Sequence, residues 1–140
     1  GMKFDFMLSN PPYGKSWSSE QRYIKDDKKI IDSRFVVSLS DYWGNMSECD
    51  ATPRSSDGQL LFLMEMVDKI KPTSISKLGS RIASVHNGSS LFTGDAGGGE
   101  SNIRRYIIEN DLLDAIIQLP NNLFYNTLNF YPYTYFFDLA

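Results

Sequence analysis

The chain has 140 residues, about the size of one domain, so we expect a single domain over residues 2–140 with one hydrophobic core. Its 14 basic and 17 acidic side chains give a net charge of −3, which excludes a basic domain that binds nucleic acid mainly through its phosphates. A hydrophobic content of 41% excludes a disordered chain, and no apolar run approaches the roughly 20 residues that span a bilayer.

The first predicted element is a short buried strand over residues 3–9, where the sequence is mostly apolar. It is stopped by the tetrapeptide Asn10-Pro11-Pro12-Tyr13. Each proline fixes its own φ, lacks an N–H and pushes the preceding residue away from helix, so the chain turns stiffly here. The turn therefore lies at the carboxyl end of a strand, which is the edge where open α/β sheets bind ligands.

Residues 15–56 form a long polar excursion with an irregular pattern, in which we expect one or two short helices. A segment of this length inside a compact domain is usually functional or mobile. It holds Cys49, the single cysteine of the chain, which excludes an internal disulfide and a cysteine-based zinc site, and we expect no metal. A lone cysteine suits a reducing compartment, and the opening residues lack the pattern of a secretion signal, so we expect the protein in the cytoplasm.

The next predicted element is a helix that Ser56 or Asp57 caps and Pro72 stops. Lys69 and Lys71 lie in its expected last turn, where positive charge favours the helix dipole. Its apolar positions recur at spacings of three and four residues, as in a helix with one face in a core: Leu60, Leu63, Met64, Val67 and Ile70.

Strands and helices alternate over the rest of the chain. We expect a strand at residues 81–86, a glycine-rich loop tip at 94–99, a helix at 102–110 capped by Ser101, and a strand at 114–119. The order strand, helix, strand, helix, strand predicts parallel strands joined by right-handed crossovers, which is an α/β fold. Residues 131–139 are rich in aromatic side chains and indicate a last strand, antiparallel to the previous one.

The tetrapeptide Asn10-Pro11-Pro12-Tyr13 has the composition of a pocket for an exocyclic amine on a planar ring, such as adenine. The carboxamide oxygen of Asn10 and the carbonyl oxygen of Pro11 are acceptors for the two amine hydrogens, and Pro12 fixes the turn that aims them. Two such bonds concentrate electron density on the nitrogen and favour its attack on an electrophilic methyl group. Tyr13 offers a ring face for stacking, which an adenine paired in duplex DNA reaches only by swinging out of the helix. The alternative interpretation is that the tetrapeptide is only a turn after a strand.

The tetrapeptide resembles the signature of amino-methyltransferases, in which Asp, Asn or Ser precedes two prolines and an aromatic residue. Nearly the whole span from residue 4 to residue 127 resembles the modification subunit of type I restriction-modification systems. The matching segments are, in order, 56–63 (SDGQLLFL), 79–83 (GSRIA), 87–89 (NGS), 91–97 (LFTGDAG), 103–105 (IRR), 107–113 (IIENDLL), 119–120 (LP) and 123–127 (LFYNT). The resemblance implies an enzyme that transfers a methyl group from S-adenosyl-L-methionine to N6 of adenine in DNA. It assigns the amine-holding and base-stacking roles to Asn10, Pro11 and Tyr13, with Pro12 fixing the turn.

The resemblance also implies partners. These are DNA, contacted through a flipped adenine, a separate specificity subunit and often a restriction subunit. The lack of a long apolar run separately predicts no role at a membrane.

The resemblance covers only the second half of the family's catalytic domain. In the family, an upstream glycine-containing loop and an acidic residue cradle the cofactor, and this chain begins after that region. We therefore expect a partial class I (Rossmann-like) methyltransferase fold, with a mostly parallel sheet and an antiparallel last strand. We expect the isolated chain to be inactive and assign it no cofactor-binding residue. The opening strand has a bare edge where the first strand of the family would lie, which predicts self-association through that edge or through the aromatic tail.

Two other functions stay open. The chain is alternatively a non-catalytic truncated remnant or self-associating module that transfers no methyl group. The tetrapeptide is also shared by enzymes that methylate an amide or an amine on protein or RNA.

Three further features have simpler interpretations. The glycines at 94–99 are spaced as in a phosphate-binding loop, but the lysine that such a loop needs does not follow them. His86 ends a strand, and we expect a packed histidine rather than a ligand or a base. Arg104 and Arg105 are candidates for contacts with DNA phosphates, and the favoured interpretation is two solvated side chains.

Overall fold

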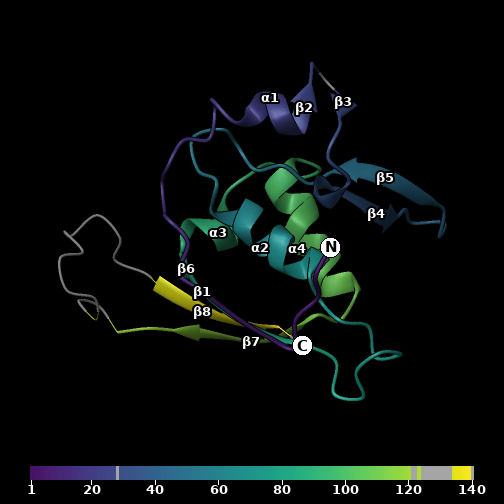
Figure 1. Cartoon of the computed structure of the whole chain (residues 1–140). Helices are drawn as coiled ribbons and strands as arrows, with labels where there is room; N and C mark the ends of the chain where they lie inside the picture. The colour runs from purple at the N-terminus through teal and green to yellow at the C-terminus, as the bar shows by residue number, and fades with distance from the viewer. Residues whose placement is uncertain (28, 121–122, 124–133, 140) are drawn as a thin grey trace.

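The computed structural model describes residues 1–27, 29–120, 123 and 134–139. Its main element is a four-stranded sheet with the strand order β1, β6, β8 and β7. The strands are β1 (Phe6–Ser9), β6 (Arg81–Asn87), β7 (Leu113–Gln118) and β8 (Thr134–Leu139). Helices α2 (Gln59–Asp68) and α4 (Gly99–Glu109) lie together on one side of this sheet (Figure 1). The α/β layout predicted from the sequence is therefore confirmed.

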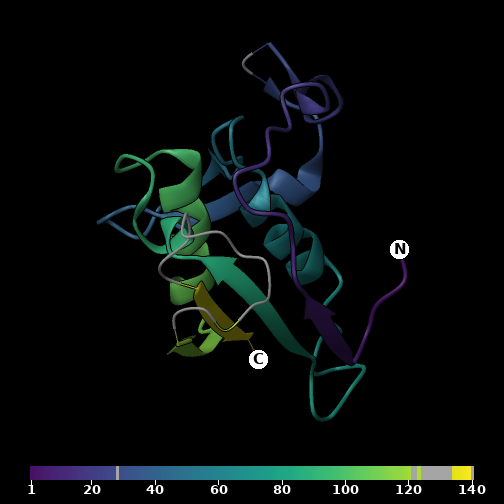
Figure 2. The same cartoon turned by 90° about the vertical axis from the view of Figure 1, so that its left-hand side faces the viewer.

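The sheet mixes parallel and antiparallel pairs. β1 pairs with β6 in parallel, with Phe6 opposite Arg81 and Ser9 opposite Ser84. β8 lies between β6 and β7 and pairs antiparallel with both. Three strands therefore share one direction and the last is reversed, as expected, but only one of the three pairings is parallel, since the reversed strand separates β6 from β7 (Figure 2).

The two long helices cover the sheet through a stripe of apolar side chains. Leu63 of α2, Ile82 of β6 and Ile103 of α4 are all at most 2% exposed and belong to one hydrophobic cluster. Gly58 and not Ser56 or Asp57 is the N-cap of α2, and the Asp57 carboxylate accepts the N–H of Gln59 instead.

The helix ends differ from those expected. α2 ends at Asp68, and Lys69 is its C-cap, so Lys69 and Lys71 do not lie in its last turn. α4 begins at Gly99 with Gly98 as its N-cap, so Ser101 lies within the first turn and does not cap the helix. A further short helix, α3 (Ser89–Phe92), follows β6 directly and was not predicted.

The polar excursion carries more structure than its sequence indicates. It contains the short helices α1 (Gln21–Ile24) and η1 (Ser33–Phe35), which match the expected number of helices. It also contains four strands that were not predicted, namely the small pair β2 (Lys25–Asp26) and β3 (Lys29–Ile30) and the longer hairpin β4 (Val36–Ser40) and β5 (Met46–Asp50). Val37 and Leu39 are buried in the same core as the two long helices, so the excursion is packed onto the rest of the fold.

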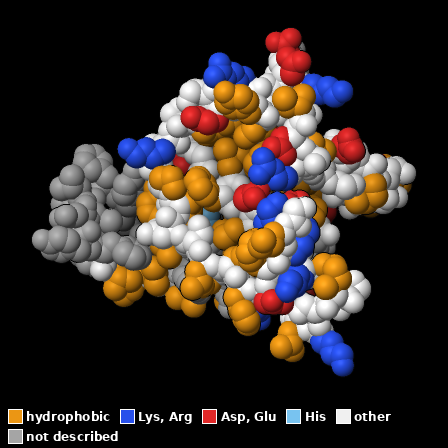
Figure 3. Space-filling model, viewed as in Figure 1, with side chains coloured by type: hydrophobic (Ala, Val, Ile, Leu, Met, Phe, Trp, Pro, Cys, Tyr) orange, Lys and Arg blue, Asp and Glu red, His pale blue; other side chains and the backbone are white. Residues whose placement is uncertain are grey.

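The prediction that β1 is a buried strand is wrong. Phe6 is 75% exposed and Leu8 is 85% exposed, whereas Met7, on the other face, packs against the core. Helices α2 and α4 cover only one face of the sheet, and Phe6 and Leu8 point away from it. Figure 3 shows hydrophobic side chains gathered along the lower side of the molecule, where Figure 1 places the sheet. Within the described residues, every helix is too short or too polar to cross a bilayer.

Candidate functional site

The tetrapeptide lies directly after the last residue of β1, at the carboxyl end of an edge strand, as predicted. Asn10 and Pro12 are exposed, Pro11 is buried and Tyr13 is half-buried. The Tyr13 hydroxyl donates a hydrogen bond of 2.6 Å to Oδ1 of Asn10. Burial raises the pKa of Tyr13, so its hydroxyl remains a neutral donor. The structure thus brings the predicted acceptor and the predicted stacking ring together. We call residues 10–13 the corner.

The segment after the corner is fastened to the loop before α2. The backbone N–H of Trp17 donates to the Ser55 carbonyl at 2.9 Å, and its indole N–H donates to the Arg54 carbonyl at 2.9 Å. The N–H of Gly58 donates to the carbonyl of Lys15 at 3.1 Å. These bonds join two stretches that lie about 40 residues apart in the sequence, so the corner has a fixed platform.

A cavity of about 400 Å³ opens on one side of the corner. Apolar side chains, among them Pro12, Trp17, Phe35 and Phe62, line it together with charged side chains. Asn10 and Tyr13 do not line this cavity. The exposed carboxamide of Asn10 therefore faces open surface rather than this apolar hollow.

The neighbouring strand β6 ends in a set of buried polar groups. His86 is fully buried, and its Nδ1 lies 3.3 Å from Oε1 of Gln59. The same oxygen accepts the backbone N–H of Asn87 at 3.0 Å, so the hydrogen-bond network places the proton of the neutral imidazole on Nδ1. Burial lowers the pKa of His86 to about 4, and the charge of Asp57 opposes this only in part. The packed histidine expected from the sequence is what the structure shows.

This histidine makes the stability of the fold depend on pH. Its pKa is about 4 in the folded chain and near the ordinary 6.5 when unfolded, so only the unfolded chain binds a proton between these values. The free energy of unfolding is expected to fall by about 3 kcal/mol as the pH drops from about 6.5 to about 4. Urea unfolding of the wild type and of His86→Leu across this range checks the prediction. The variant should lack this part of the fall, and equal falls in the two proteins would contradict it.

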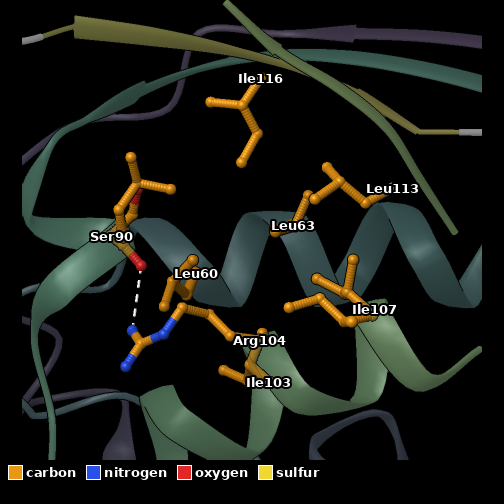
Figure 4. A pocket seen from close by; sticks show the side chains of 10 residues that line it. Leu60, Leu63, Ser90, Ile103, Arg104, Ile107, Leu113 and Ile116 are labelled. Atoms are coloured by element: carbon orange, nitrogen blue, oxygen red, sulfur yellow. Dashed lines mark hydrogen bonds between the residues drawn. The ribbon is translucent and has the colours of Figure 1, made fainter. Parts of the chain in front are cut away.

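A second cavity, of about 190 Å³, lies between the sheet and the helices (Figure 4). Leu60 and Leu63 of α2, Ile103 and Ile107 of α4, and Leu113 and Ile116 of β7 line it. Arg104 also lines the cavity, and its guanidinium donates to the carbonyl oxygen of Ser90 at 3.0 Å. Arg104 is half-buried, and desolvation lowers the pKa of its guanidinium, so the expected solvated side chain is only partly exposed to solvent. Figure 4 shows an apolar hollow that contains none of the corner residues.

The other candidate residues from the sequence have structural contacts in place of a ligand site. Arg105 pairs with Glu109 at 2.5 Å and donates to the Ser40 carbonyl, so it ties α4 to the hairpin. Gly94 and Gly97 adopt φ values of +91° and +80°, which only glycine takes readily, in a loop that leads into α4. In the described part of the chain, no group of three His, Cys, Asp or Glu side chains is arranged to hold a metal ion.

Sequence reasoning missed two residues at the site. Asp57 was considered only as a helix cap, and Gln59 was given no role. The structure buries both, at 8% and 2% exposure, between the corner and the end of β6. In the sequence, Asp57 and Gln59 are only polar residues before the apolar stripe of a helix, and nothing in that pattern indicates that they are buried.

Comparisons with known proteins identify the family. A family model described as N-6 DNA Methylase matches residues 1–129. The type I restriction enzyme MjaIX methylase subunit of Methanocaldococcus jannaschii is 28% identical over 125 residues, which are 89% of this chain and 18% of that protein. The type I restriction enzyme MpnII methylase subunit of Mycoplasma pneumoniae is 24% identical over 124 residues, again 89% of this chain and 18% of that protein.

Solved structures show the same similarity. The methyltransferase subunit of a type I restriction-modification system from Streptococcus thermophilus superposes with a TM-score of 0.65 and 26% identity, over 100% of this chain and 24% of that one. A chain from a structure of type I restriction-modification complex assembly superposes with a TM-score of 0.62 and 22% identity, over 100% of this chain and 22% of that one. This match supports a shared fold. The chain therefore spans about one fifth of the length of the curated relatives that it matches.

Proposed function

The chain belongs to the N-6 DNA methylase family, and on that premise we propose that it carries the part of a type I modification subunit that holds the target adenine during methyl transfer. The observation that carries the proposal is the corner itself. Asn10 presents an exposed carboxamide at the carboxyl end of β1, with the Tyr13 hydroxyl 2.6 Å from its oxygen. Ligands of open α/β sheets bind at this edge.

In this proposal the corner activates a neutral amine without a base. Asn10 Oδ1 and the carbonyl oxygen of Pro11 accept the two hydrogens of adenine N6, and the N6 lone pair forms the new bond to the methyl carbon. A carboxamide oxygen has two lone pairs, so Asn10 accepts from the Tyr13 hydroxyl and from the amine together. After transfer the nitrogen releases one proton to solvent.

The methyl donor of the family is S-adenosyl-L-methionine, which supplies a methyl group on a positively charged sulfur that keeps the electron pair of the broken bond. Asn10, Pro11, Pro12 and Tyr13 are neutral acceptors and rings, which fit a flat ring with an amine. They do not form a cradle for the charged amino-acid end of the donor, and we assign no residue of this chain to the cofactor. The partners that we propose are DNA through a flipped adenine, a specificity subunit and a restriction subunit.

The topology supports the finer assignment to half of a class I, Rossmann-like fold. β1 is an edge strand that pairs with β6 alone among the described strands, so its outer edge is open where a further parallel strand would fit. The observed direction of all four strands also agrees with this proposal, including the reversed β8.

Calorimetry with S-adenosyl-L-methionine tests whether the chain works within a larger enzyme. The assembled modification enzyme should bind the cofactor saturably, and this chain alone should give no saturable heat. If the assembled enzyme also fails to bind, the chain is a non-catalytic remnant, which is the second candidate function.

One observation favours self-association in the isolated chain. The open edge of β1 adjoins Phe6 and Leu8, both largely exposed, and Ile117 of β7 is 50% exposed. Edge strands with apolar side chains pair with other chains, and charge on them prevents this. The aromatic tail, the other predicted contact, lies largely outside the described residues.

Leu8→Lys is therefore expected to shift the isolated chain from dimers or larger species to monomer. Sedimentation velocity over a range of protein concentrations measures this change. Ile75→Lys, in the loop after α2, is the matched control because Ile75 is 72% exposed and belongs to no strand of the sheet. A wild-type chain that stays monomeric at high concentration would contradict the proposal.

A further inference from the structure

A buried carboxylate lies directly behind the corner. Asp57 is 8% exposed and accepts the backbone N–H of Gly14, the residue after Tyr13, at 3.1 Å. Its second oxygen accepts from Nε2 of Gln59 at 2.8 Å and from the Ser89 hydroxyl at 3.4 Å. A carboxylate is costly to bury, and these partners are neutral donors. Burial of Asp57 among neutral donors therefore contributes little net stability, and its position points to another role.

Gln59 continues the network to the neighbouring strand. Its Nε2 donates to Asp57 and, at 3.0 Å, to Ser89 Oγ. Its Oε1 accepts from the N–H of Asn87 at 3.0 Å and from Nδ1 of His86 at 3.3 Å. Both ends of one amide are therefore used, and only one orientation of that amide satisfies all partners, since Asn87 N–H is solely a donor.

The hydrogen bond from Gly14 to Asp57 restricts the corner, because the backbone of the corner has few free torsions. Pro11 and Pro12 each have a fixed φ, so little freedom is left before Tyr13. The N–H of Gly14 belongs to the peptide that follows Tyr13, and Gly14 itself has a φ of +59°. Holding this N–H on Asp57 fixes the plane of that peptide, and with it the exit of the chain from the corner.

We propose that Asp57, acting through Gln59, is a positioning residue that fixes the corner relative to the carboxyl end of β6, on the premise that the corner holds a target amine as proposed above. The network joins Gly14, directly after the corner, to Asn87, the last residue of β6, through two side chains at the N-terminus of α2. Because hydrogen bonds to N6 require correct placement of two oxygens, a displaced corner lowers the rate of transfer more than the binding of either substrate.

Exchanging the carboxylate of Asp57 and the amide of Gln59 between the two positions gives a test of the network. Asp57→Asn places an NH2 group against the NH2 group of Gln59, and turning the glutamine over only moves the conflict to the N–H of Asn87. In the double variant Asp57→Asn with Gln59→Glu, the new amide donates to the new carboxylate. The carboxylate then accepts from Asn87 and His86, while the amide oxygen still accepts from Gly14. The net charge of the network is unchanged.

Two measurements test the proposal. Hydrogen exchange at the Gly14 amide, followed in this chain, should become at least about 10-fold faster in Asp57→Asn and return to the wild-type rate in the double variant. In the assembled enzyme, kcat for methyl transfer should fall about 100-fold in Asp57→Asn, with KM for DNA and cofactor nearly unchanged, and recover in the double variant. Glu48→Gln, an exposed change on β5, is the control that should alter neither.

The outcomes separate this proposal from the function on which it rests. Unchanged Gly14 exchange in Asp57→Asn, or a double variant that stays folded by circular dichroism without recovery, overturns the positioning role. If Gly14 exchange responds and recovers as expected but the wild-type assembly does not methylate adenine N6, the proposed function fails while Asp57 keeps its role in fixing the corner.

Discussion

Replacing Asn10 with Ala in the assembled modification enzyme is expected to lower kcat for methyl transfer by about 10²- to 10³-fold. The variant lacks the carboxamide oxygen that we propose accepts one amine hydrogen, and which accepts the Tyr13 hydroxyl at 2.6 Å. Because the lost bond acts on the reacting nitrogen, the affinity for S-adenosyl-L-methionine should change little. Single-turnover transfer of a labelled methyl group to duplex DNA, with calorimetry for the cofactor, measures both quantities.

Two further variants make the result specific to the acceptor. Asn10→Asp keeps an oxygen in the same place and matches the acidic form of the signature, so it should retain more activity than Asn10→Ala. Asn110→Ala, at the exposed C-cap of α4, should leave transfer unchanged. Activity in Asn10→Ala near that of the wild type would reject the assigned role of Asn10.

Replacing Gly99 with Ala is expected to lower the free energy of unfolding by about 4 kcal/mol or more. Gly99 is the first residue of α4, and a Cβ there would lie 1.7 Å from the backbone carbonyl oxygen of Thr52. A backbone oxygen does not move aside as a flexible side chain does. Either α4 or the segment after β5 has to shift, and urea unfolding of the isolated chain measures the cost.

That shift would also break the contacts that join α4 to this segment. Glu100 accepts the N–H of Arg54 at 2.8 Å, and Nδ2 of Asn102 donates to the Asp50 carbonyl at 2.9 Å. Gly97→Ala is the matched control, since its added Cβ meets nothing within 4 Å and only its φ of +80° is unfavourable, at about 1–2 kcal/mol. Equal losses in the two variants would contradict close packing at Gly99.

The elements that sequence alone predicts well are those with a strong local pattern. Four of the five apolar positions predicted at helical spacing lie within α2, and β6 alternates apolar and polar side chains over much of its length after a glycine-containing turn. The hairpin β4–β5 was missed because its pattern rests on little more than Val37 and Leu39, flanked by serines that also occur in loops.

Other features depend on contacts that no local pattern encodes. The run in β1 is apolar, but whether Phe6 and Leu8 are covered depends on which sheet face receives the helices. The place of β8 between β6 and β7 depends on strand neighbours, which periodicity does not specify.

The candidate site divides in the same way. The corner was predictable because two prolines after a strand dictate a stiff turn, and the structure places it at the carboxyl end of β1. The supporting network was not, because Asp57 meets Gly14 across 43 residues of sequence, and Gln59 meets Asn87 across 28. Burial of these polar side chains is a property of the folded chain alone.

The central claim is that the corner presents two oxygen acceptors to the amine of a flipped adenine. A crystal structure of the assembled enzyme with duplex DNA and an unreactive analogue of S-adenosyl-L-methionine tests it most directly. We predict that Asn10 Oδ1 and the Pro11 carbonyl oxygen each lie within about 3.2 Å of adenine N6, with Tyr13 against the base. An N6 atom held by other groups, with either oxygen more than about 4 Å away, would contradict the account.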